Sequence, residues 1–558
     1  MSEIHPPPTP DKDAVHIAKK PRLEETESGE AIVQADEAVQ EDALAASSST
    51  AAKQAKAKSA KKSNKKKKQK VPLIEPYSNE DVIFQDVKAL LGEEAVLKAQ
   101  EAGSELKAPF EFKQELELVV SALSSNGESL SIAPAPYPPW VVLTPFALPG
   151  EKIRVKIYRN ARLWSHADLV EVIEPNTELR DMDRIGCKYF GKCAGCQFQM
   201  LSYDTQLDLK RNVVSTIGSP LQYGYRTKIT PHFESPLRDL KKHGRPADGS
   251  KPDWFKIGFN VIGTRNTMDI EECPIATPTL NKALGPIREG ILEKMETYKR
   301  GVSLLLRESL EIPTESSATP SQDEAMDALV EETEKKLCVT DHRGTIRERV
   351  GDKLFEYTAG SFFQNNNSVL VPLTDYVRDC IFPTAPASID TPRPTHLVDA
   401  YCGSGLFAIT LSPHFSRVTG IELSTDSIKS ANISAKLNNL SPEQHTFMSG
   451  DASDIFATVT SFPRAETAVI IDPPRKGSDE KFIDQLIEFG AAVVVYVSCN
   501  VHTQARDVGM ILKKSQAKRE KEGGKEYTLE TVRGFDLFPQ TAHVESVAVL
   551  RLVNVEHA

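Results

Sequence analysis

Residues 397–409 read LVDAYCGSGLFAI, and this short stretch decides the fold of the C-terminal part of the chain. Its first residues predict a buried strand, Gly403 and Gly405 predict a tight turn, and the apolar run that follows predicts the start of a helix. Glycine at these two positions lets the backbone pass close beneath a ligand without a side-chain clash. A strand, a glycine turn and a helix in this order indicate one unit of an α/β sheet.

Strands and helical segments alternate outward from this stretch, over about residues 350–553. The runs 418–423, 467–471 and 493–497 are short and largely apolar, as expected of strands that are buried on both faces. Alternation of this kind is typical of a doubly wound sheet. We therefore predict an α/β fold, with a Rossmann-like domain over 349–558 built on a mixed, mostly parallel sheet.

The rest of the chain divides by composition and by pattern. The first part is rich in Ala, Ser, Glu and Lys and poor in aromatic residues, which is typical of disorder. Further on, short alternating runs separated by turn residues are typical of a small barrel. The predicted segments are a low-complexity tail at 1–70, a short helical preface at 71–110, a small β-barrel at 111–177 and a central α+β domain at 178–348 with an acidic insert near 311–334.

Composition limits the classes of function. No apolar run approaches the ~18 residues that a membrane span needs, and the first thirty residues do not read as a signal peptide, so we expect an intracellular protein outside the membrane. Eight cysteines are too few for a disulfide scaffold and lie mostly in clusters, which in a reducing compartment indicates metal binding or catalysis. A net charge of −10 means that nucleic-acid binding would need a local basic surface.

Basic runs at 19–22 and 61–70 bear on location. Such runs are typical of a solvated tail, a nuclear address or an RNA tether. We expect the protein in the nucleus, the cytoplasm or both.

Two acidic residues follow strands at positions where open α/β sheets bind ligands. Glu422 ends the second strand, nineteen residues after Gly403, and can accept hydrogen bonds from ribose hydroxyls. The glycine loop and this acid also satisfy a dinucleotide fingerprint, so they do not separate S-adenosylmethionine from NAD. Asp472 follows the next apolar strand and precedes two prolines, which hold it at the rim of the sheet. A dehydrogenase would give this second stretch no role.

One thiol and one carboxylic acid point to a reaction. Cys499 follows the apolar strand 493–497 within Ser-Cys-Asn, and Glu545 lies beside His543 near the C-terminus. By position alone, Cys499 also fits a buried packing residue and Glu545 an exposed loop acid. Methylation of uracil at C5 would use both, because a thiolate that adds to C6 makes C5 nucleophilic and a base must then remove the C5 proton.

Five ordered motifs carry a resemblance to a known family: FFQNN at 362–366, DAYCGSG at 399–405, DPPR at 472–475, SCN at 498–500 and HVE at 543–545. With them, the chain over about 110–553 resembles the RNA 5-methyluridine methyltransferases, which use S-adenosylmethionine to methylate uracil C5. The resemblance implies that Cys499 is the nucleophile and that Glu545 accepts the proton.

The same resemblance implies the contacts of cofactor and substrate. It implies that the S-adenosylmethionine site is lined by Gln364, Tyr401, Gly403, Gly405, Glu422, Asp451 and Asp472. Phe362 would lie near the target base, although it also fits an ordinary core aromatic.

Four cysteines of the central domain form a pattern of soft ligands: Cys187, Cys193, Cys196 and Cys273. By spacing alone they suit an iron–sulfur cluster or tetrahedral zinc about equally, and free thiols stay open as a third interpretation. The resemblance implies a [4Fe–4S] cluster, because some family members hold one with a Cys-x5-Cys-x2-Cys run and a distant cysteine before proline.

The resemblance also implies the partner. The barrel at 111–177 resembles the TRAM module (an OB-like barrel), and small barrels commonly bind oligonucleotides. The long low-complexity tail looks eukaryotic, and eukaryotic relatives act mainly on the T-loop uridine of tRNA, nucleotide 54. We therefore expect a monomeric enzyme that acts on tRNA, with ribosomal RNA as the alternative. A non-catalytic RNA-binding or chaperone protein and an NAD enzyme are the alternatives from other classes.

Overall fold

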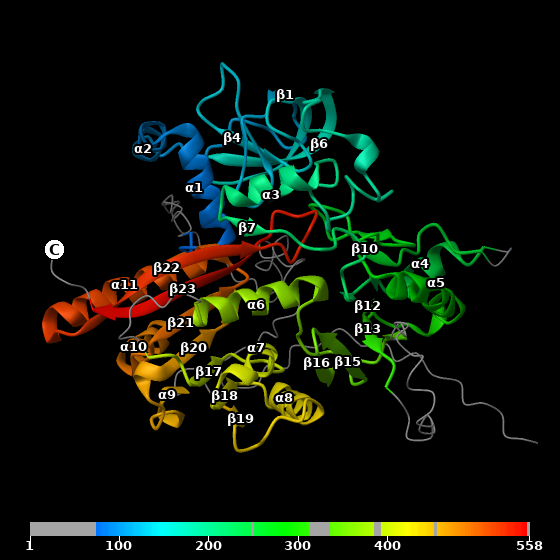
Figure 1. Cartoon of the computed structure of the whole chain (residues 1–558). Helices are drawn as coiled ribbons and strands as arrows, with labels where there is room; N and C mark the ends of the chain where they lie inside the picture. The colour runs from blue at the N-terminus through cyan, green and yellow to red at the C-terminus, as the bar shows by residue number, and fades with distance from the viewer. Residues whose placement is uncertain (1–73, 247–249, 313–334, 384–391, 451–454, 555–558) are drawn as a thin grey trace, which may run out of the picture.

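The computed structural model describes residues 74–246, 250–312, 335–383, 392–450 and 455–554. The predicted tail, most of the acidic insert and Asp451 lie outside these residues. Figure 1 shows a large sheet flanked by helices, a smaller unit of strands and helices above it and a third unit at its side. In the ranges given, no helix is long and apolar enough to cross a membrane.

The large sheet has eight strands, seven of them from the C-terminal part of the chain. Their order is β19 (His445–Ser449), β18 (Arg417–Glu422), β17 (His396–Ala400), β20 (Thr467–Ile471), β21 (Val493–Ser498), β23 (Glu545–Asn554), β22 (Lys525–Phe535) and β7 (Thr216–Ile217). The strands from β19 to β21 pair in parallel, and β23 is antiparallel to both of its neighbours. The α/β fold with a mixed, mostly parallel sheet is therefore confirmed.

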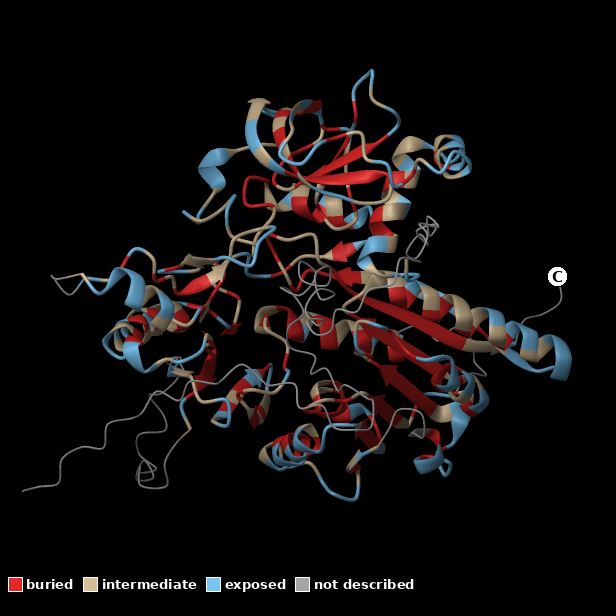
Figure 2. Cartoon of the chain, turned by 180° about the vertical axis from the view of Figure 1, so that it is seen from behind, coloured by how far each residue is buried: buried red, intermediate tan, exposed pale blue. Residues whose placement is uncertain are grey.

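Helices cover both faces of this sheet. They are α6 (Leu370–Ile381), α7 (Leu406–Thr410), α8 (Thr425–Leu437), α9 (Ile455–Thr458), α10 (Glu480–Phe489) and α11 (Val501–Glu522). Successive residues of β21 enter opposite cores, Val494 on one face and Val495 on the other. A strand buried on both faces has no solvent-facing position, which explains its unbroken apolar run. Figure 2 shows these strands buried and the outer side of α11 exposed.

Residues 115–174 form a separate six-stranded sheet. Its order is β1 (Glu115–Val119), β5 (Lys152–Asn160), β6 (Trp164–Glu174), β4 (Val141–Thr144), β3 (Ser129–Ile132) and β2 (Ala122–Leu123). Along β5, Ile153 and Val155 are fully buried, whereas the intervening Arg154 forms ion pairs on the outside. The preceding helices α1 (Asn79–Leu91) and α2 (Glu93–Glu101) pack on the same apolar core.

The third unit, called the central unit below, lies between these two sheets in the sequence. Its elements are α3 (Tyr203–Arg211), β8 (Lys228–Ile229), β9 (His232–Phe233), α4 (Leu237–His243), β10 (Gly258–Asn260), β11 (Thr267–Asp269), α5 (Pro278–Glu293), β12 (Val302–Ser303), β13 (Leu306–Leu310) and β14 (Lys336–Val339). A hairpin of β15 (Thr345–Val350) and β16 (Lys353–Thr358) leads on to α6. The pairing of Ile217 with Phe535 joins this unit to the edge of the large sheet.

Candidate active site

Cys499 and Glu545 lie at the ends of two neighbouring strands. β21 and β23 pair antiparallel as far as Ser498 opposite Ser546. Cys499 comes one residue after the end of β21, and Glu545 is the first residue of β23, so both lie directly beyond the last facing pair of the ladder. The thiol and the carboxylic acid, 46 residues apart in the sequence, therefore belong to one site.

Burial governs the protonation of both groups. It raises the pKa of the Cys499 thiol to about 12, with the charges of Glu545 and Asp472 raising it further and Arg475 opposing them. Burial and the charge of Asp472 raise the pKa of Glu545 to about 8, again against Arg475. Among the described residues, Glu545 Oε1 has no hydrogen-bond partner. A buried carboxyl oxygen left without a partner indicates that a ligand meets it.

The predicted cofactor residues gather at the carboxyl edge of the parallel strands. Ala400 is in register with Ile421 on one side and Ile471 on the other, so Tyr401, Glu422 and Asp472 follow at the same level. This edge is where open α/β sheets bind ligands.

Backbone amides hold the carboxylate of Glu422 in place. Gly403 N donates to Glu422 Oε2 at 3.3 Å, and Ser424 N donates to Oε1 at 2.9 Å. The Glu422 side chain therefore lies directly beside the glycine loop, where a cofactor's ribose could meet both. Tyr401 has a left-handed backbone conformation, with φ of 63°, at the start of this loop.

Asp399 belongs to the glycine-loop motif, although the sequence predicted no role for it. Its side chain joins the strand before the loop to the helix after it. Its Oδ2 accepts a hydrogen bond from Ala408 N at 2.9 Å, so it ties the strand to the first turn of α7. Burial raises the pKa of Asp399 to about 8, and Asp472 and Glu422 raise it further. Asp399, Glu422 and Asp472 are therefore close enough for their charges to act on one another.

The segment that carries Phe362 and Gln364 is held from the central unit. Arg307, on β13, donates to Ser361 O at 2.8 Å, and Thr227 N donates to Asn365 O at 2.9 Å. Phe362 is 50% exposed and is therefore not a core aromatic, whereas Gln364 is partly buried. An anchored loop thus presents an exposed ring that is free to stack on a base.

Arg475 is the last residue of the DPPR motif, and the sequence predicted no function for it. Its positive charge lowers the pKa values of Cys499 and Glu545 and also that of His543. Its backbone oxygen accepts hydrogen bonds from Asn500 Nδ2 and Thr503 Oγ1, both at the start of α11. The loop after β20 is thereby fastened to the loop that carries Cys499.

Side chains of α3 hold the loop that precedes Glu545. The sequence did not predict these contacts. Lys210 Nζ lies 2.6 Å from Asp536 Oδ1. Gln206 and Gln540 exchange two hydrogen bonds at 3.0 Å, one through the Gln540 backbone N–H. The available signal was the spacing of Gln206, Leu207 and Lys210, which all lie on the buried face of α3.

His543, two residues before Glu545, is half-buried in this loop. Burial lowers its pKa to about 3, with Arg475 and Lys210 adding to the effect. The imidazole is therefore neutral at physiological pH, and its ring packs edge-on against Phe538, with the ring centroids 5.0 Å apart.

The four central cysteines lie within electrostatic reach of one another. Burial raises the pKa of Cys193 to about 12, and the charges of Cys273 and Cys187 raise it further. The pKa of Cys196 is raised in the same way, by burial and by the other three thiols. Within the described residues, no group of three or more His, Cys, Asp or Glu side chains has the arrangement of a metal site. The metal prediction therefore stays a prediction.

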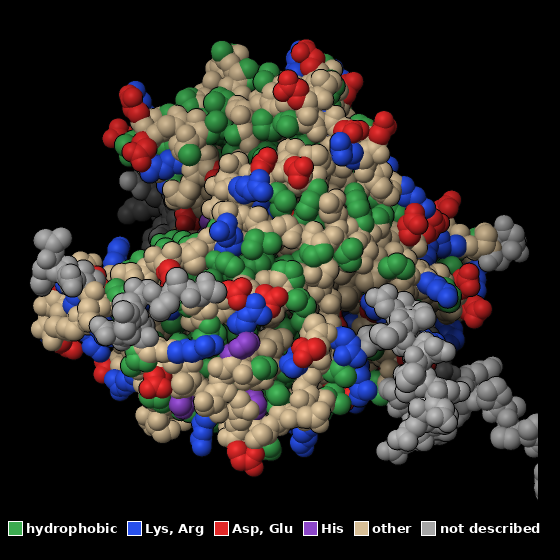
Figure 3. Space-filling view, in the orientation of Figure 1, with side chains coloured by type: hydrophobic (Ala, Val, Ile, Leu, Met, Phe, Trp, Pro, Cys, Tyr) green, Lys and Arg blue, Asp and Glu red, His purple; other side chains and the backbone are tan. Residues whose placement is uncertain are grey.

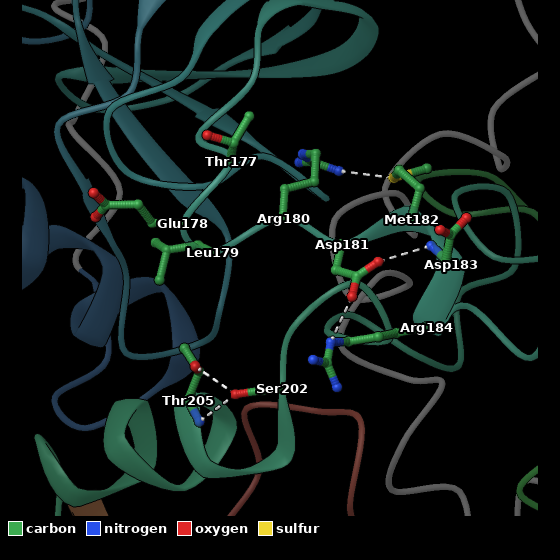
Figure 4. A pocket seen from close by; sticks show the side chains of 10 residues that line it. All are labelled: Thr177, Glu178, Leu179, Arg180, Asp181, Met182, Asp183, Arg184, Ser202 and Thr205. Atoms are coloured by element: carbon green, nitrogen blue, oxygen red, sulfur yellow. Dashed lines mark hydrogen bonds and ion pairs between the residues drawn. The ribbon is translucent and has the colours of Figure 1, made fainter.

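A pocket lies between the segment 177–184 and the start of α3 (Figure 4). Several of its polar groups pair with one another: Arg184 pairs with Asp181 at 3.0 Å, and Ser202 contacts Thr205 at 2.7 Å. It contains none of the predicted site residues. Figure 3 shows that acidic and basic side chains are intermixed over the face of the molecule seen in Figure 1.

Comparisons with known proteins agree with this geometry. Residues 317–553 match the family described as tRNA (Uracil-5-)-methyltransferase. The chain is 43% identical over 464 residues to a tRNA (uracil(54)-C(5))-methyltransferase of Schizosaccharomyces pombe, covering 80% of each chain. It is 40% identical over 478 residues to the protein of the same name from Saccharomyces cerevisiae, covering 78% of this chain and 73% of that one.

A solved structure shares the fold. It is the tRNA (uracil-54, C5)-methyltransferase of Pyrococcus abyssi in complex with S-adenosyl-L-homocysteine, with a TM-score of 0.53 and 22% identity. The match covers 78% of this chain and 100% of that one. The predicted Rossmann-like methyltransferase fold is thereby confirmed.

Proposed function

The chain belongs to the tRNA (uracil-5-)-methyltransferase family, and on this premise we propose that it methylates C5 of uridine 54 in the T-loop of tRNA, with S-adenosylmethionine as methyl donor. The observation that carries the proposal is the facing position of Cys499 and Glu545 at the end of the ladder between β21 and β23. Glu545 is 1% exposed and is therefore not an exposed loop acid. The charge of Asp472 acts on both Cys499 and Glu545, so the two groups lie in one site.

Cys499 and Glu545 act at the beginning and at the end of the reaction. Cys499 loses its proton to solvent and its sulfur adds to C6 of the uracil, which places the displaced electron pair on C5 and O4. S-adenosylmethionine, when bound, would supply an electrophilic methyl group to C5 and leave as S-adenosylhomocysteine. Glu545, in its ionised form, then removes the C5 proton, the C5–C6 double bond re-forms, and the C6–S bond breaks to release the thiolate of Cys499.

Protonation is the barrier that the site must overcome at the start. With the pKa of Cys499 raised to about 12, the thiol is protonated in the empty protein at neutral pH. Arg475 is the charge that opposes this shift, so we infer that it stabilises the thiolate. The exposed ring of Phe362 offers a stacking surface for the base.

A tRNA transcript containing 5-fluorouridine tests this function. Fluorine at C5 cannot leave as a proton does, so the enzyme should stay covalently joined to the RNA after methyl transfer. We expect a denaturation-resistant adduct with the native protein and none with Cys499→Ala. Absence of the native adduct, or its persistence in Cys499→Ala, would refute the assignment.

Ribosomal RNA is the second candidate substrate, because the same residues could act on any accessible uracil. Nucleoside mass spectrometry of separated tRNA and ribosomal RNA, from cells with and without the protein, decides between them. We expect loss of 5-methyluridine from the tRNA fraction alone.

We further propose that Cys187, Cys193, Cys196 and Cys273 hold a [4Fe–4S] cluster, with zinc as the alternative. Support comes from the donor set of four thiols. The charges of neighbouring cysteines raise the pKa values of Cys193, Cys196 and Cys273, and thiolates are the ligands of a soft-metal site. Iron, sulfide and zinc analysis of protein purified without oxygen tests it. Stoichiometric iron and sulfide that disappear in Cys196→Ser would support the cluster.

We also propose that the sheet at 115–174 acts as a TRAM-like module that contacts RNA, and that the protein works as a monomer in the nucleus, the cytoplasm or both. Support for the first point is the position of this sheet beside the catalytic sheet (Figure 1). Sedimentation of the purified chain tests its oligomeric state, and microscopy of the tagged full chain tests its location.

A further inference from the structure

Exposed cations gather at the outer end of the central unit, on α4 and on the turn that follows α5. Over residues 235–245 and 294–301, Lys and Arg outnumber Asp and Glu by seven to two, in a chain whose net charge is −10. We define the α4 basic surface as the exposed residues Arg238, Lys241, Lys242, Lys299 and Arg300.

Tertiary contacts join the two segments into one surface. At the start of α4, Ser235 Oγ donates to Tyr298 O at 3.3 Å. Just after the end of α4, Arg245 donates to Leu292 O at 3.2 Å and to Glu293 O at 3.3 Å. Both ends of α4 are thus fastened to the end of α5 and its following turn, so cations distant in sequence are neighbours in space.

These cations have no acidic partner, unlike many others among the described residues. In the described ranges, none of the five side chains of the α4 basic surface forms an ion pair within 4 Å. On the outer face of β5, in contrast, Arg154 pairs with Glu117 and Glu171. Along α11, Lys514 pairs with Asp484 and Glu480. Exposed cations without an acidic partner stay available for an outside anion.

The chemistry of the surface favours a phosphate backbone over a protein partner. Interfaces between proteins have an apolar centre surrounded by polar residues. Among the described residues between 222 and 336, no large apolar side chain is exposed, so such a centre is missing here. Flexible lysines and arginines in water suit phosphates, which they bind as point charges with release of counterions.

We propose that the α4 basic surface binds the phosphate backbone of the substrate RNA, away from the uracil that reacts. The inference rests on the tRNA substrate proposed above. Figure 1 places α4 at the far side of the central unit from the catalytic sheet, so the contact would fall on a part of the tRNA outside the T-loop nucleotide. The surface supplies local positive charge among the described residues of a chain whose net charge is −10.

Salt-dependent binding of tRNA to two matched variants tests this inference. The first variant is Arg238→Ala/Lys241→Ala/Lys242→Ala. The control, Lys514→Ala/Lys518→Ala/Lys521→Ala, removes the same charge from α11, which lies at the opposite end of the molecule in both Figure 1 and Figure 2. Fluorescence anisotropy with unmodified tRNA, without S-adenosylmethionine, reports affinity from 0.05 to 0.3 M salt.

We expect the first variant to bind tRNA at least about tenfold more weakly near 0.15 M salt, with a log–log salt slope shallower by about one for each lost contact. The control should stay within about twofold of the native protein, because its cations are already paired. Native affinity and slope in the first variant, or equal losses in both variants, would overturn the inference.

The binding measurement is independent of turnover. If the native protein binds tRNA through this surface but forms no adduct with fluorouridine RNA, the proposed reaction fails while the RNA contact stands. If the native protein methylates tRNA and the first variant binds tRNA normally, the RNA contact fails while the reaction stands.

Discussion

Lys210 and Asp536 form an ion pair that solvent does not reach. Lys210 Nζ lies 2.6 Å from Asp536 Oδ1, with the two side chains 1% and 0% exposed. Tyr203 OH donates to the other carboxylate oxygen at 2.9 Å, and Phe538 N donates to Oδ1 at 3.1 Å. The pair therefore fixes the loop that leads from β22 to Glu545 against α3 of the central unit.

Removing one partner of this pair should destabilise the protein strongly. In Lys210→Met the carboxylate of Asp536 stays buried without its counter-charge, so we expect a loss of about 3–5 kcal/mol in the free energy of unfolding. Lys210→Met/Asp536→Asn removes both charges and should recover much of that loss. Urea unfolding at pH 7 measures both variants. A loss below about 1 kcal/mol in the single variant would contradict a structural role for the pair.

Glu545→Gln should trap the enzyme on its normal substrate. The amide cannot accept the C5 proton, so the methylated adduct should form through Cys499 and then fail to break down. We expect elimination to slow by at least about 10²-fold, the usual contribution of a general base. Denaturing gels with unmodified tRNA and labelled S-adenosylmethionine measure the adduct. Normal turnover of Glu545→Gln would assign the base to another group.

Affinity for S-adenosylmethionine should rise with pH. Burial and the charge of Glu422 raise the pKa of Asp472 to about 7, so below that pH its carboxyl is protonated and neutral. Only the ionised form attracts the positive charges of the cofactor, so affinity should increase about tenfold between pH 6 and pH 8. Calorimetry at several pH values measures it. In Asp472→Asn the binding should be weaker and flatter with pH, and an unchanged pH profile would remove Asp472 from the site.

The two loop glycines should differ in their tolerance of alanine. Gly405 has φ of 91°, and a Cβ there would lie 3.0 Å from Ile409 Cδ1, whereas Gly403 has φ of 53° and no atom within 4 Å of an added Cβ. Gly405→Ala combines strain with crowding and should cost about 2–3 kcal/mol, against about 1 kcal/mol for Gly403→Ala. Thermal unfolding of the two variants measures the difference. Equal losses would show that crowding at Ile409 is relieved without cost.

Local patterns were enough to predict the fold and most of the proposed site. The run 397–409 shows a strand, a turn and a helix within thirteen residues. Asp472 and Cys499 each follow an apolar strand directly, and parallel strands place such positions at one edge of the sheet. These predictions needed only the order of residues along the chain, because a strand fixes the position of the residue that follows it.

Contacts between distant segments could not be predicted in this way. Lys210 and Asp536 are 326 residues apart, and Gln206 and Gln540 are 334 apart. A buried charge is stable only beside its partner. The residues around Lys210 in the sequence do not indicate that this partner is Asp536.

The sequence by itself thus determined the α/β sheet and the glycine loop, and it predicted which thiol and which acid take part in the reaction. The tertiary structure alone decided that Cys499 faces Glu545, because β23 enters the sheet antiparallel beside β21. It also decided that Arg475 acts on both groups and that the cations of α4 and of the turn after α5 form one surface. The physical reason is that strand pairing and electrostatics depend on distance in space, which the chain sets only once it has folded.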